Sequence, residues 1–396
     1  METFILKNGV KVVFCRRKTE SLAIEVGIKV GSDNENAGNN GISHFLEHML
    51  FEGTKKRTTL QIANEIESLG GDLNAATTNE RTLVYVKLPK KHFEVALDVL
   101  SDIILNPIFD KKAIEKERKV ILSEINLVND EPRFYQWILF QKELFRGSQA
   151  ALPTYGAVDI VKKLKRKDFV DYYKKHYVGS NIVISIVGDL ENVKEKAEEY
   201  FSLIEKGVPG KRIEIKNKNK SSSITEKKHI SHSYVVLGYK TVDRKSRESY
   251  VFDIIRAVLG RGQSGKLFDE IRTKRGLAYE VGVLNDNGID HGFFSVYFNC
   301  GKENIDKIIN ITVGEFKKLQ KLTLKELNEA KTFLEGEFIV ENEDSRHYAD
   351  FINFEQFADA PEDYIGEIRK VTLNDVKRTA GKYLNEDYVL AIVKQK

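Results

Sequence analysis

Three ionisable residues in a largely apolar stretch, residues 41–51, have the types and spacing to do chemistry. The stretch reads Gly-Ile-Ser-His-Phe-Leu-Glu-His-Met-Leu-Phe. We expect a short buried helix with Ser43 as its N-cap, because the apolar residues leave no clearly polar face. Burying His44, Glu47 and His48 is costly unless each side chain has a partner. The three residues therefore need a ligand or a partner that the stretch itself does not supply.

The spacing of these residues predicts a metal site. In a helix, His44 and His48 lie one turn apart and about 40° apart around the axis, so both rings can reach one small ion. Glu47 falls about 60° to the other side of His44, near that ion but displaced from the pair. This is the H-x-x-E-H order of inverted zinc peptidases, with two imidazole ligands and a carboxylate base. The alternative is a pair of hydrogen-bonded core histidines.

A third metal ligand is expected on a second helix, residues 110–129. Asp110 is a suitable cap, and apolar residues recur after it at helical spacing. Glu117 and Glu124 lie about 20° apart around the axis, within that apolar stripe. Acidic residues on a core-facing stripe are unusual because an unpaired buried carboxylate is costly. Either they face a metal ion with its imidazoles, or they lie at the helix edge and reach solvent.

The sequence resembles the pitrilysin/insulinase family of zinc peptidases, in particular its mitochondrial processing peptidase-like branch, over essentially the whole chain. The matching residues are His44, Glu47 and His48, then Glu117 and Glu124, with Glu124 76 residues beyond His48 as in that family. The flanking residues also match, namely 41–43, 51–54 and 70–75. The resemblance implies that His44, His48 and Glu124 bind one zinc ion. It also implies that Glu47 is the catalytic base and that Glu117 is a second acid that orients His44 or His48.

The resemblance also implies two pairs of substrate-binding residues. Asn74 and Ala75, on an expected edge strand, would hold the backbone of an extended peptide. Arg272 and Tyr279 would meet the substrate from the domain opposite zinc, either within the chain or across a dimer interface. Read without the resemblance, Asn74 is an edge-strand residue, Arg272 a solvated helix residue and Tyr279 a strand aromatic.

One loop departs from the family pattern. Where the family has His-Pro followed by Gly, residues 149–156 read Gln-Ala-Ala-Leu-Pro-Thr-Tyr-Gly. The substrate contacts of this loop are therefore left open.

The strand and helix patterns predict an α+β fold with two homologous domains, each a mainly antiparallel sheet with helices packed on one face. A chain of 396 residues suits two domains of about 200 residues each. We expect a catalytic domain over 1–205, a linker over 206–228 with a possible edge strand at 212–215, and a second domain over 229–396. Residues 382–393 repeat the pattern of residues 176–187, but the second domain has no H-x-x-E-H.

Composition excludes several classes of function. The 63 basic and 59 acidic residues indicate an intermixed surface and no nucleic-acid footprint. No run of 18 apolar residues occurs, so no membrane span is expected. Cys15 and Cys300 are too few for a disulfide framework, which favours a reducing, cytoplasmic location.

A glycine-rich segment, residues 260–266, matches two phosphate-binding patterns, G-x-G-x-x-G and G-x-x-x-x-G-K. A helical pattern precedes it where both motifs require a strand, and residue 267 is Leu where a P-loop needs Ser or Thr. We interpret it as a turn between helices, with nucleotide binding as the alternative.

These observations together predict a zinc endopeptidase that hydrolyses peptides or unfolded polypeptide segments and forms a homodimer. The alternative is a catalytically inactive partner or scaffold subunit of the same family. Such a subunit usually lacks a metal ligand or the base, and this sequence keeps all five residues.

Overall fold

The structure is a computed structural model that describes residues 1–210, 212, 215 and 220–396. The expected edge strand at 212–215 therefore falls partly outside the described residues. The chain forms two compact units. Unit 1 comprises residues 1–126, 152–213 and 341–357, and unit 2 comprises residues 127–151, 214–340 and 358–396.

Unit 1 contains a six-stranded sheet in the order β1-β2-β6-β3-β5-β4. Only the β2–β6 pair is parallel. The strands are β1 Glu2–Ile5, β2 Lys11–Arg16, β3 Ser21–Ile28, β4 Asp72–Thr77, β5 Thr82–Pro89 and β6 Ile182–Gly188. Strand β4 is an edge strand, as the sequence predicts.

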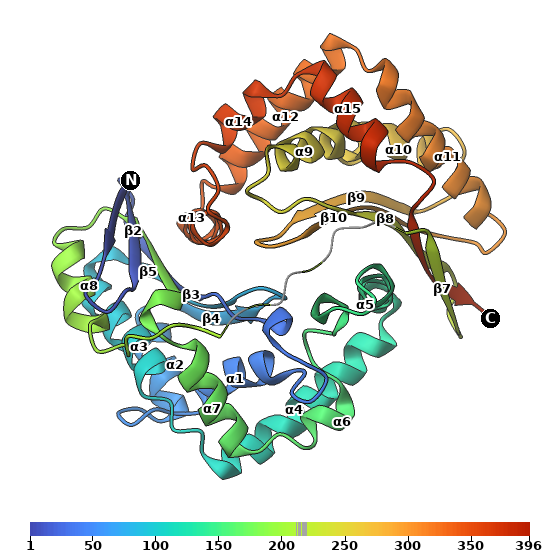
Figure 1. Cartoon of the computed structure of the whole chain (residues 1–396). Helices are drawn as coiled ribbons and strands as arrows, with labels where there is room; N and C mark the ends of the chain where they lie inside the picture. The colour runs from blue at the N-terminus through green and yellow to red at the C-terminus, as the bar shows by residue number, and fades with distance from the viewer. Residues whose placement is uncertain (211, 213–214, 216–219) are drawn as a thin grey trace. The chain divides into compact units, whose positions relative to one another are not determined.

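Helices cover one face of this sheet, as Figure 1 shows for α1, α2 and α7. Alternate residues of β3, such as Ile24 and Val26, are fully buried in a core shared with these helices. The helices of this layer are α1 Ile42–Phe51, α2 Thr59–Glu67, α3 Phe93–Leu105, α4 Lys111–Asp130, α6 Val158–Val161, α7 Arg166–His176 and α8 Val193–Phe201.

Unit 2 contains a five-stranded sheet in the order β7-β11-β8-β10-β9, in which only β7–β11 is parallel. The strands are β7 Ser222–Lys228, β8 Ser233–Thr241, β9 Glu280–Asn287, β10 Gly292–Cys300 and β11 Val389–Gln395. The helices are α5 Pro132–Leu144, α9 Arg247–Gly260, α10 Lys266–Phe268, α11 Ile305–Lys318, α12 Leu324–Glu341, α14 Tyr364–Lys370 and α15 Leu373–Tyr383. The two sheets share one strand arrangement, so the α+β class with two homologous domains is confirmed.

The linear division into 1–205, 206–228 and 229–396 is corrected by an exchange of helices. Helix α13 (Ser345–Ala358) comes from the second half of the sequence but belongs to unit 1, and α5 comes from the first half but belongs to unit 2. In addition, β7 at Ser222–Lys228 takes up the end of the expected linker. Each exchanged helix covers the second face of a sheet. Local sequence patterns cannot show this, because they do not reveal which sheet an amphipathic helix will cover.

A glycine at the equivalent position of each sheet allows the exchanged helix to come close. Gly27 on β3 pairs with Val183, and a Cβ at Gly27 would lie 2.1 Å from Asn353 Oδ1 of α13. Gly238 on β8 pairs with Val389, and its Cβ would lie 2.6 Å from the Phe140 ring of α5. The close packing of α5 and α13 on the two sheets therefore depends on a glycine, which has no side chain, in the strand that each helix covers.

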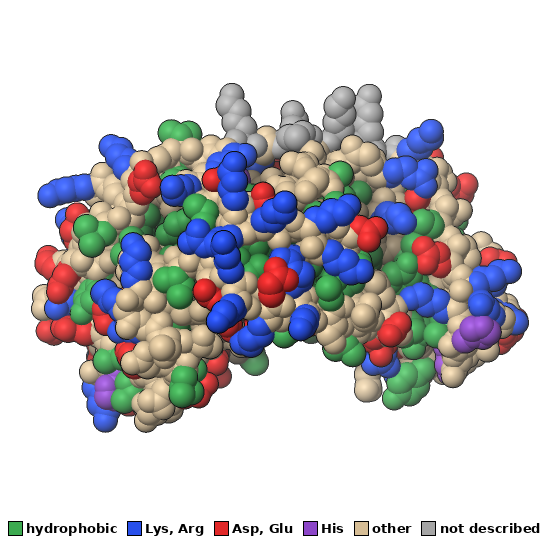
Figure 2. Space-filling model, turned by 90° about the horizontal axis from the view of Figure 1, so that it is seen from below, with side chains coloured by type: hydrophobic (Ala, Val, Ile, Leu, Met, Phe, Trp, Pro, Cys, Tyr) green, Lys and Arg blue, Asp and Glu red, His purple; other side chains and the backbone are tan. Residues whose placement is uncertain are grey.

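The surface carries mixed charge. Figure 2 shows Lys and Arg side chains interspersed with Asp and Glu over the visible face, which agrees with the nearly balanced composition of 63 basic and 59 acidic residues. Among the described residues, none of the helices is long and apolar enough to cross a lipid bilayer.

A double-mutant cycle tests the packing of α13. We expect Gly27→Ala to destabilise the protein by about 1–3 kcal/mol through overpacking. Asn353→Ala should cost about 1 kcal/mol because it removes the hydrogen bond from Nδ2 to Val183 O. The double variant should be more stable than the sum of the two losses by about 1 kcal/mol, since the clash disappears.

Urea denaturation measures these three free energies of unfolding. Gly336→Ala is the control, because a Cβ there meets open space on α12 and a helical Gly→Ala change should stabilise slightly. Strict additivity of the two substitutions would contradict the contact.

Candidate metal centre

Helix α1 is buried by its apolar residues and begins two residues earlier than a Ser43 cap would require. Phe45, Leu46 and Met49 are fully buried. The N-cap is Gly41, with φ +94°, and Ser43 lies in the first turn. The prediction of Ser43 as the N-cap is therefore wrong, because the left-handed backbone at Gly41 lets the helix begin at Ile42.

A buried carboxylate, Glu35, satisfies the first N–H groups of α1 in place of a local cap. Its Oε2 accepts hydrogen bonds from Gly41 N at 2.7 Å and from Asn40 Nδ2 at 2.9 Å, and its Oε1 accepts one from Ser43 N at 2.8 Å. Burial raises the pKa of Glu35 to about 7, against the lowering effect of these donors. Sequence patterns do not indicate this role, since the spacing of Glu35 matches no capping pattern.

The two histidines of α1 converge with Glu124 of α4. Glu124 Oε2 lies 3.9 Å from His44 Nε2 and 3.6 Å from His48 Nε2. One potential ligand atom from each residue lies within 4.8 Å of the other two. Neighbouring ligand atoms in a tetrahedral zinc site are roughly 3.3 Å apart, given metal–ligand distances of about 2.0–2.1 Å. The sequence-predicted trio is therefore close to the spacing that zinc requires.

Glu117 lies beside His48 and not beside His44. Its Oε2 is 3.3 Å from His48 Nδ1, so Nδ1–H donates to the carboxylate and the lone pair of Nε2 faces Glu124. Lys116 contacts the other oxygen of Glu117 at 3.2 Å and Glu52 at 2.9 Å. The sequence left open whether Glu117 would orient His44 or His48, and in the structure Glu117 contacts His48.

Glu47 lies in the same site with a partner that the sequence analysis missed. The Thr77 hydroxyl of β4 donates to Glu47 Oε2 at 2.6 Å. Burial raises the pKa of Glu47 above its usual value, while Thr77 and His48 act against this rise. A carboxylate with a raised pKa is a better proton acceptor, as a general base requires. Thr77 falls in the predicted edge strand, but nothing in its sequence context distinguishes it.

The residues present fit a zinc ion. Burial lowers the pKa of His44 to about 3, with His48 as a second cause, and the neutral imidazole is the form that binds metals. Glu124 Oε2 is buried without a hydrogen-bond partner, although a buried carboxylate oxygen normally has one. Two imidazoles and a carboxylate are the donor set of a catalytic zinc site.

The predicted substrate residues Asn74 and Ala75 lie on the open edge of the unit 1 sheet. They pair with Tyr85 and Val84 of β5 on one side only. Asn74 Oδ1 accepts a hydrogen bond from Ala75 N at 2.8 Å. Strand β4 also contacts α1, so the open edge adjoins the helix that carries the histidines.

The second predicted pair, Arg272 and Tyr279, lies together in unit 2. The Arg272 guanidinium is over the Tyr279 ring, 4.6 Å from its centroid, and over Phe268 at 4.9 Å. Arg272 lies in a π-helical turn, Asp269–Thr273, and Tyr279 immediately precedes β9. Tyr279 is 71% exposed. The two residues thus form one exposed cation–π pair.

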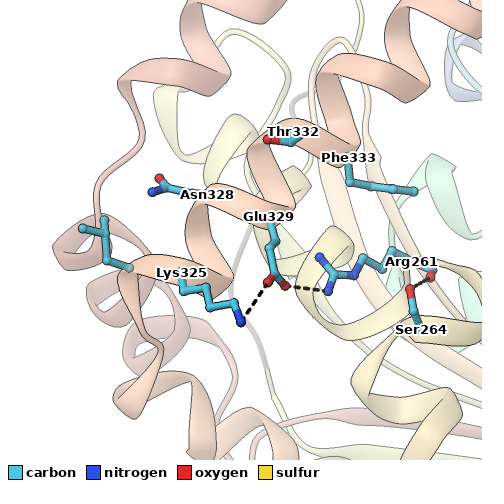
Figure 3. Close-up of a pocket in the computed structure, with 8 residues that line it drawn as sticks. Arg261, Ser264, Lys325, Asn328, Glu329, Thr332 and Phe333 are labelled. Atoms are coloured by element: carbon cyan, nitrogen blue, oxygen red, sulfur yellow. Dashed lines mark hydrogen bonds and ion pairs between the residues drawn. The ribbon is translucent and has the colours of Figure 1, made fainter.

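The glycine-rich segment 260–266 joins α9 to α10, as the sequence predicts for a turn between helices. Arg261 and Ser264 line a pocket with residues of α12, shown in Figure 3. Arg261 pairs with Glu329 at 2.9 Å and Lys266 pairs with Glu326 at 2.5 Å. Both basic residues of the segment are therefore neutralised by α12, which supports a structural turn.

Comparisons with known proteins assign the family. Residues 11–158 match the family described as insulinase (peptidase family M16), and residues 163–334 match the peptidase M16 inactive domain. A Rickettsia felis protein named uncharacterized zinc protease is 31% identical over 98% of this chain and 96% of its own length. The zinc protease YmxG of Bacillus subtilis, also named uncharacterized, is 28% identical over 99% of this chain and 98% of its own. The chain belongs to peptidase family M16, the insulinase/pitrilysin family.

Solved structures support the fold. A protease from Helicobacter pylori matches with a TM-score of 0.93 and 23% identity over 99% of both chains. A Pseudomonas fluorescens protein described as a peptidase M16 inactive domain matches with a TM-score of 0.91 and 21% identity, over 100% of this chain and 99% of that one. At these identities the comparison shows the fold alone.

The raised pKa of Glu35 predicts a pH-dependent stability. Because the folded state holds the Glu35 proton up to about pH 7 and the unfolded state releases it near 4.5, stability falls as pH rises through this window. Relative to Glu35→Gln, the wild type should lose up to about 3 kcal/mol of unfolding free energy between these pH values. Urea denaturation of both chelator-treated proteins from pH 4.5 to 8 measures the difference. Parallel stability curves for the two proteins would contradict the assignment.

Proposed function

We propose that this protein is a zinc-dependent endopeptidase that hydrolyses peptides or unfolded polypeptide segments. The observation that carries the proposal is the convergence of His44, His48 and Glu124 with Glu47 beside them. The family and the names of the relatives support a zinc protease. His44 and His48 would bind zinc through Nε2, and Glu124 through a carboxylate oxygen.

Bound zinc would lower the pKa of a water molecule toward about 7 and polarise the substrate carbonyl. Glu47 accepts a proton from the attacking water and later returns it to the leaving amine. Thr77 holds the Glu47 carboxylate through the hydrogen bond to Oε2. Glu117 accepts from His48 Nδ1, which fixes the tautomer and the orientation of that ring.

An extended substrate would add to the free edge of β4 at Asn74 and Ala75. Main-chain hydrogen bonds give affinity with little dependence on sequence, which suits unfolded segments of varied composition. The side chain of Asn74 occupies the Ala75 N–H and would yield it to a substrate carbonyl. Arg272 and Tyr279 would bind the substrate from unit 2, with Arg272 available to pair with an acidic group.

We further infer a homodimer in a reducing, cytoplasmic compartment. One chain carries both the metal residues and the Arg272–Tyr279 pair, so a second type of subunit is not required. Cys15 and Cys300 are both free, which suits such a compartment.

The second candidate is an inactive partner subunit of the family. Two of the matches carry the description inactive domain. The first of these covers residues 163–334, which contain none of the five residues of the metal centre. The activity assay below separates the two candidates.

The substitution Glu47→Gln tests the base. Wild-type protein loaded with zinc should cleave casein or a quenched fluorogenic peptide, and a chelator should abolish this cleavage. Glu47→Gln should keep its zinc and lose about two to four orders of magnitude in kcat, because the amide cannot accept the proton. Metal analysis of both proteins is the control. Near-wild-type turnover would remove Glu47 from the mechanism, and an inactive zinc-loaded wild type would favour the partner subunit.

The substitution Glu117→Gln tests the orientation of His48. The amide can still accept from Nδ1–H but carries no charge, so zinc affinity should fall about 10- to 100-fold. Competition with a fluorescent chelator measures the affinity. Glu115→Gln is the matched control, because Glu115 is exposed on the same helix and pairs with Arg118. Equal zinc affinity for Glu117→Gln and the control would show that Glu117 does not support the ligand.

A further inference from the structure

Tyr155, in the loop that departs from the family pattern, packs against a proposed zinc ligand. Its ring meets the His44 ring edge-to-face, with centroids 4.9 Å apart and an interplanar angle of 79°. His44 in turn meets His48 in the same manner at 4.7 Å. The three rings form a continuous row from the loop into the metal centre. Edge-to-face contacts of this kind hold aromatic rings in defined orientations.

The backbone around Tyr155 is fixed to the start of α1. Gly156 (φ +87°) and Gly41 (φ +94°) are in direct contact, since a Cβ on either residue would lie within 2.7 Å of the Cα of the other. Asn40 Nδ2 donates to Pro153 O at 3.1 Å. Asn40 is also held by Glu35, so one carboxylate anchors both the helix and the loop.

A second set of contacts holds the loop on its other side. Thr154 Oγ1 lies 3.1 Å from Asn79 Oδ1 and 3.5 Å from Ser32 Oγ. Tyr155 is therefore held between two anchored neighbours, Thr154 and Gly156. A side chain on such a preorganised loop loses little entropy when it contacts a ligand.

The hydroxyl of Tyr155 is available to a ligand. The residue is 36% exposed, and within the described chain no hydrogen bond engages its hydroxyl. A tyrosine with an ordinary pKa near 10 is already protonated at neutral pH and can donate a hydrogen bond.

We propose that Tyr155 is a further substrate-contacting residue, whose hydroxyl donates a hydrogen bond to the scissile carbonyl oxygen as negative charge develops there. The inference rests on the proposed peptidase function. When water attacks the carbonyl carbon, a C–O bond forms and the π electrons move to the carbonyl oxygen. Tyr155 keeps its proton throughout and stabilises this oxygen, while Glu47 takes the proton of the water. A preorganised donor aimed at a developing oxyanion is worth about 10²-fold in rate.

A purely structural role for the ring is the competing explanation. In that case the edge-to-face contact with His44 would matter and the hydroxyl would not. The substitution Tyr155→Phe separates the two, because it keeps the ring and removes only the hydroxyl. Tyr155→Leu removes both and shows the contribution of the ring to zinc affinity.

The experiment compares Tyr155→Phe with wild type in the zinc-loaded protein. We expect kcat to fall about 10²-fold, with KM and zinc content unchanged. A phosphinic pseudopeptide, which mimics the tetrahedral state, should bind the variant more weakly by a similar factor in calorimetry. In a Glu47→Gln background, the Kd of an uncleaved substrate peptide should change little, because its carbonyl carries no developed charge.

Tyr200→Phe is the matched control. Tyr200 lies on α8 of the same unit and is partly buried against its core. This variant should match wild type in kcat and in binding of the phosphinic peptide. The control shows whether loss of the hydroxyl of a partly buried tyrosine has a general effect on the fold.

The outcomes distinguish this inference from the proposed function. If the wild type cleaves peptides and Tyr155→Phe equals it in kcat and in phosphinic peptide binding, the hydroxyl has no role and the peptidase assignment stands. If Tyr155→Phe and Tyr155→Leu both lose zinc, the ring positions His44 and the inference is overturned. If the zinc-loaded wild type neither cleaves peptides nor binds the phosphinic peptide, the proposed function itself fails.

Discussion

The structure depends on holding two imidazoles and their acidic partners between α1 and α4, where His44 and Glu117 are buried and His48 and Glu124 are partly buried. Polar groups in an apolar setting are tolerated only when each has a partner. His48 has Glu117, and Glu47 has Thr77. His44 and Glu124 Oε2 are left facing each other at 3.9 Å, and a divalent cation would complete them. A metal ion bound among these residues would add to the stability of this helix pair.

The same constraint explains the surroundings of α1. A helix with apolar residues on every side must also have its first N–H groups satisfied inside the protein. Glu35 does this by accepting from the backbone N–H groups of Gly41 and Ser43. It also accepts from the Asn40 side chain, which in turn donates to Pro153 O in the loop that carries Tyr155. Support for the histidines and placement of Tyr155 therefore come from one buried carboxylate. A carboxylate that is buried at this cost is well suited to hold a site rigidly.

The exchange of α5 and α13 shows how far the internal repeat extends. Gly27 and Gly238 occupy equivalent positions in the two sheets, and each lets a helix from the other half of the sequence approach. The repeat itself is visible in the sequence, but the exchange is not. A glycine in a strand indicates a close approach without naming the partner.

The sequence by itself determined the histidine-bearing helix, the two acids on the second helix, the α+β class and strand β4, because helical and strand periodicity are local properties. The edge position of β4 followed only from the family resemblance. Tertiary structure decided the rest. It decided which imidazole Glu117 contacts and the roles of Glu35 and Thr77. It also decided the contact of Tyr155 with His44. These contacts join residues that are five or more positions apart in sequence. The true unit boundaries were decided in the same way, since the free energy of burying a helix face depends on which sheet it covers.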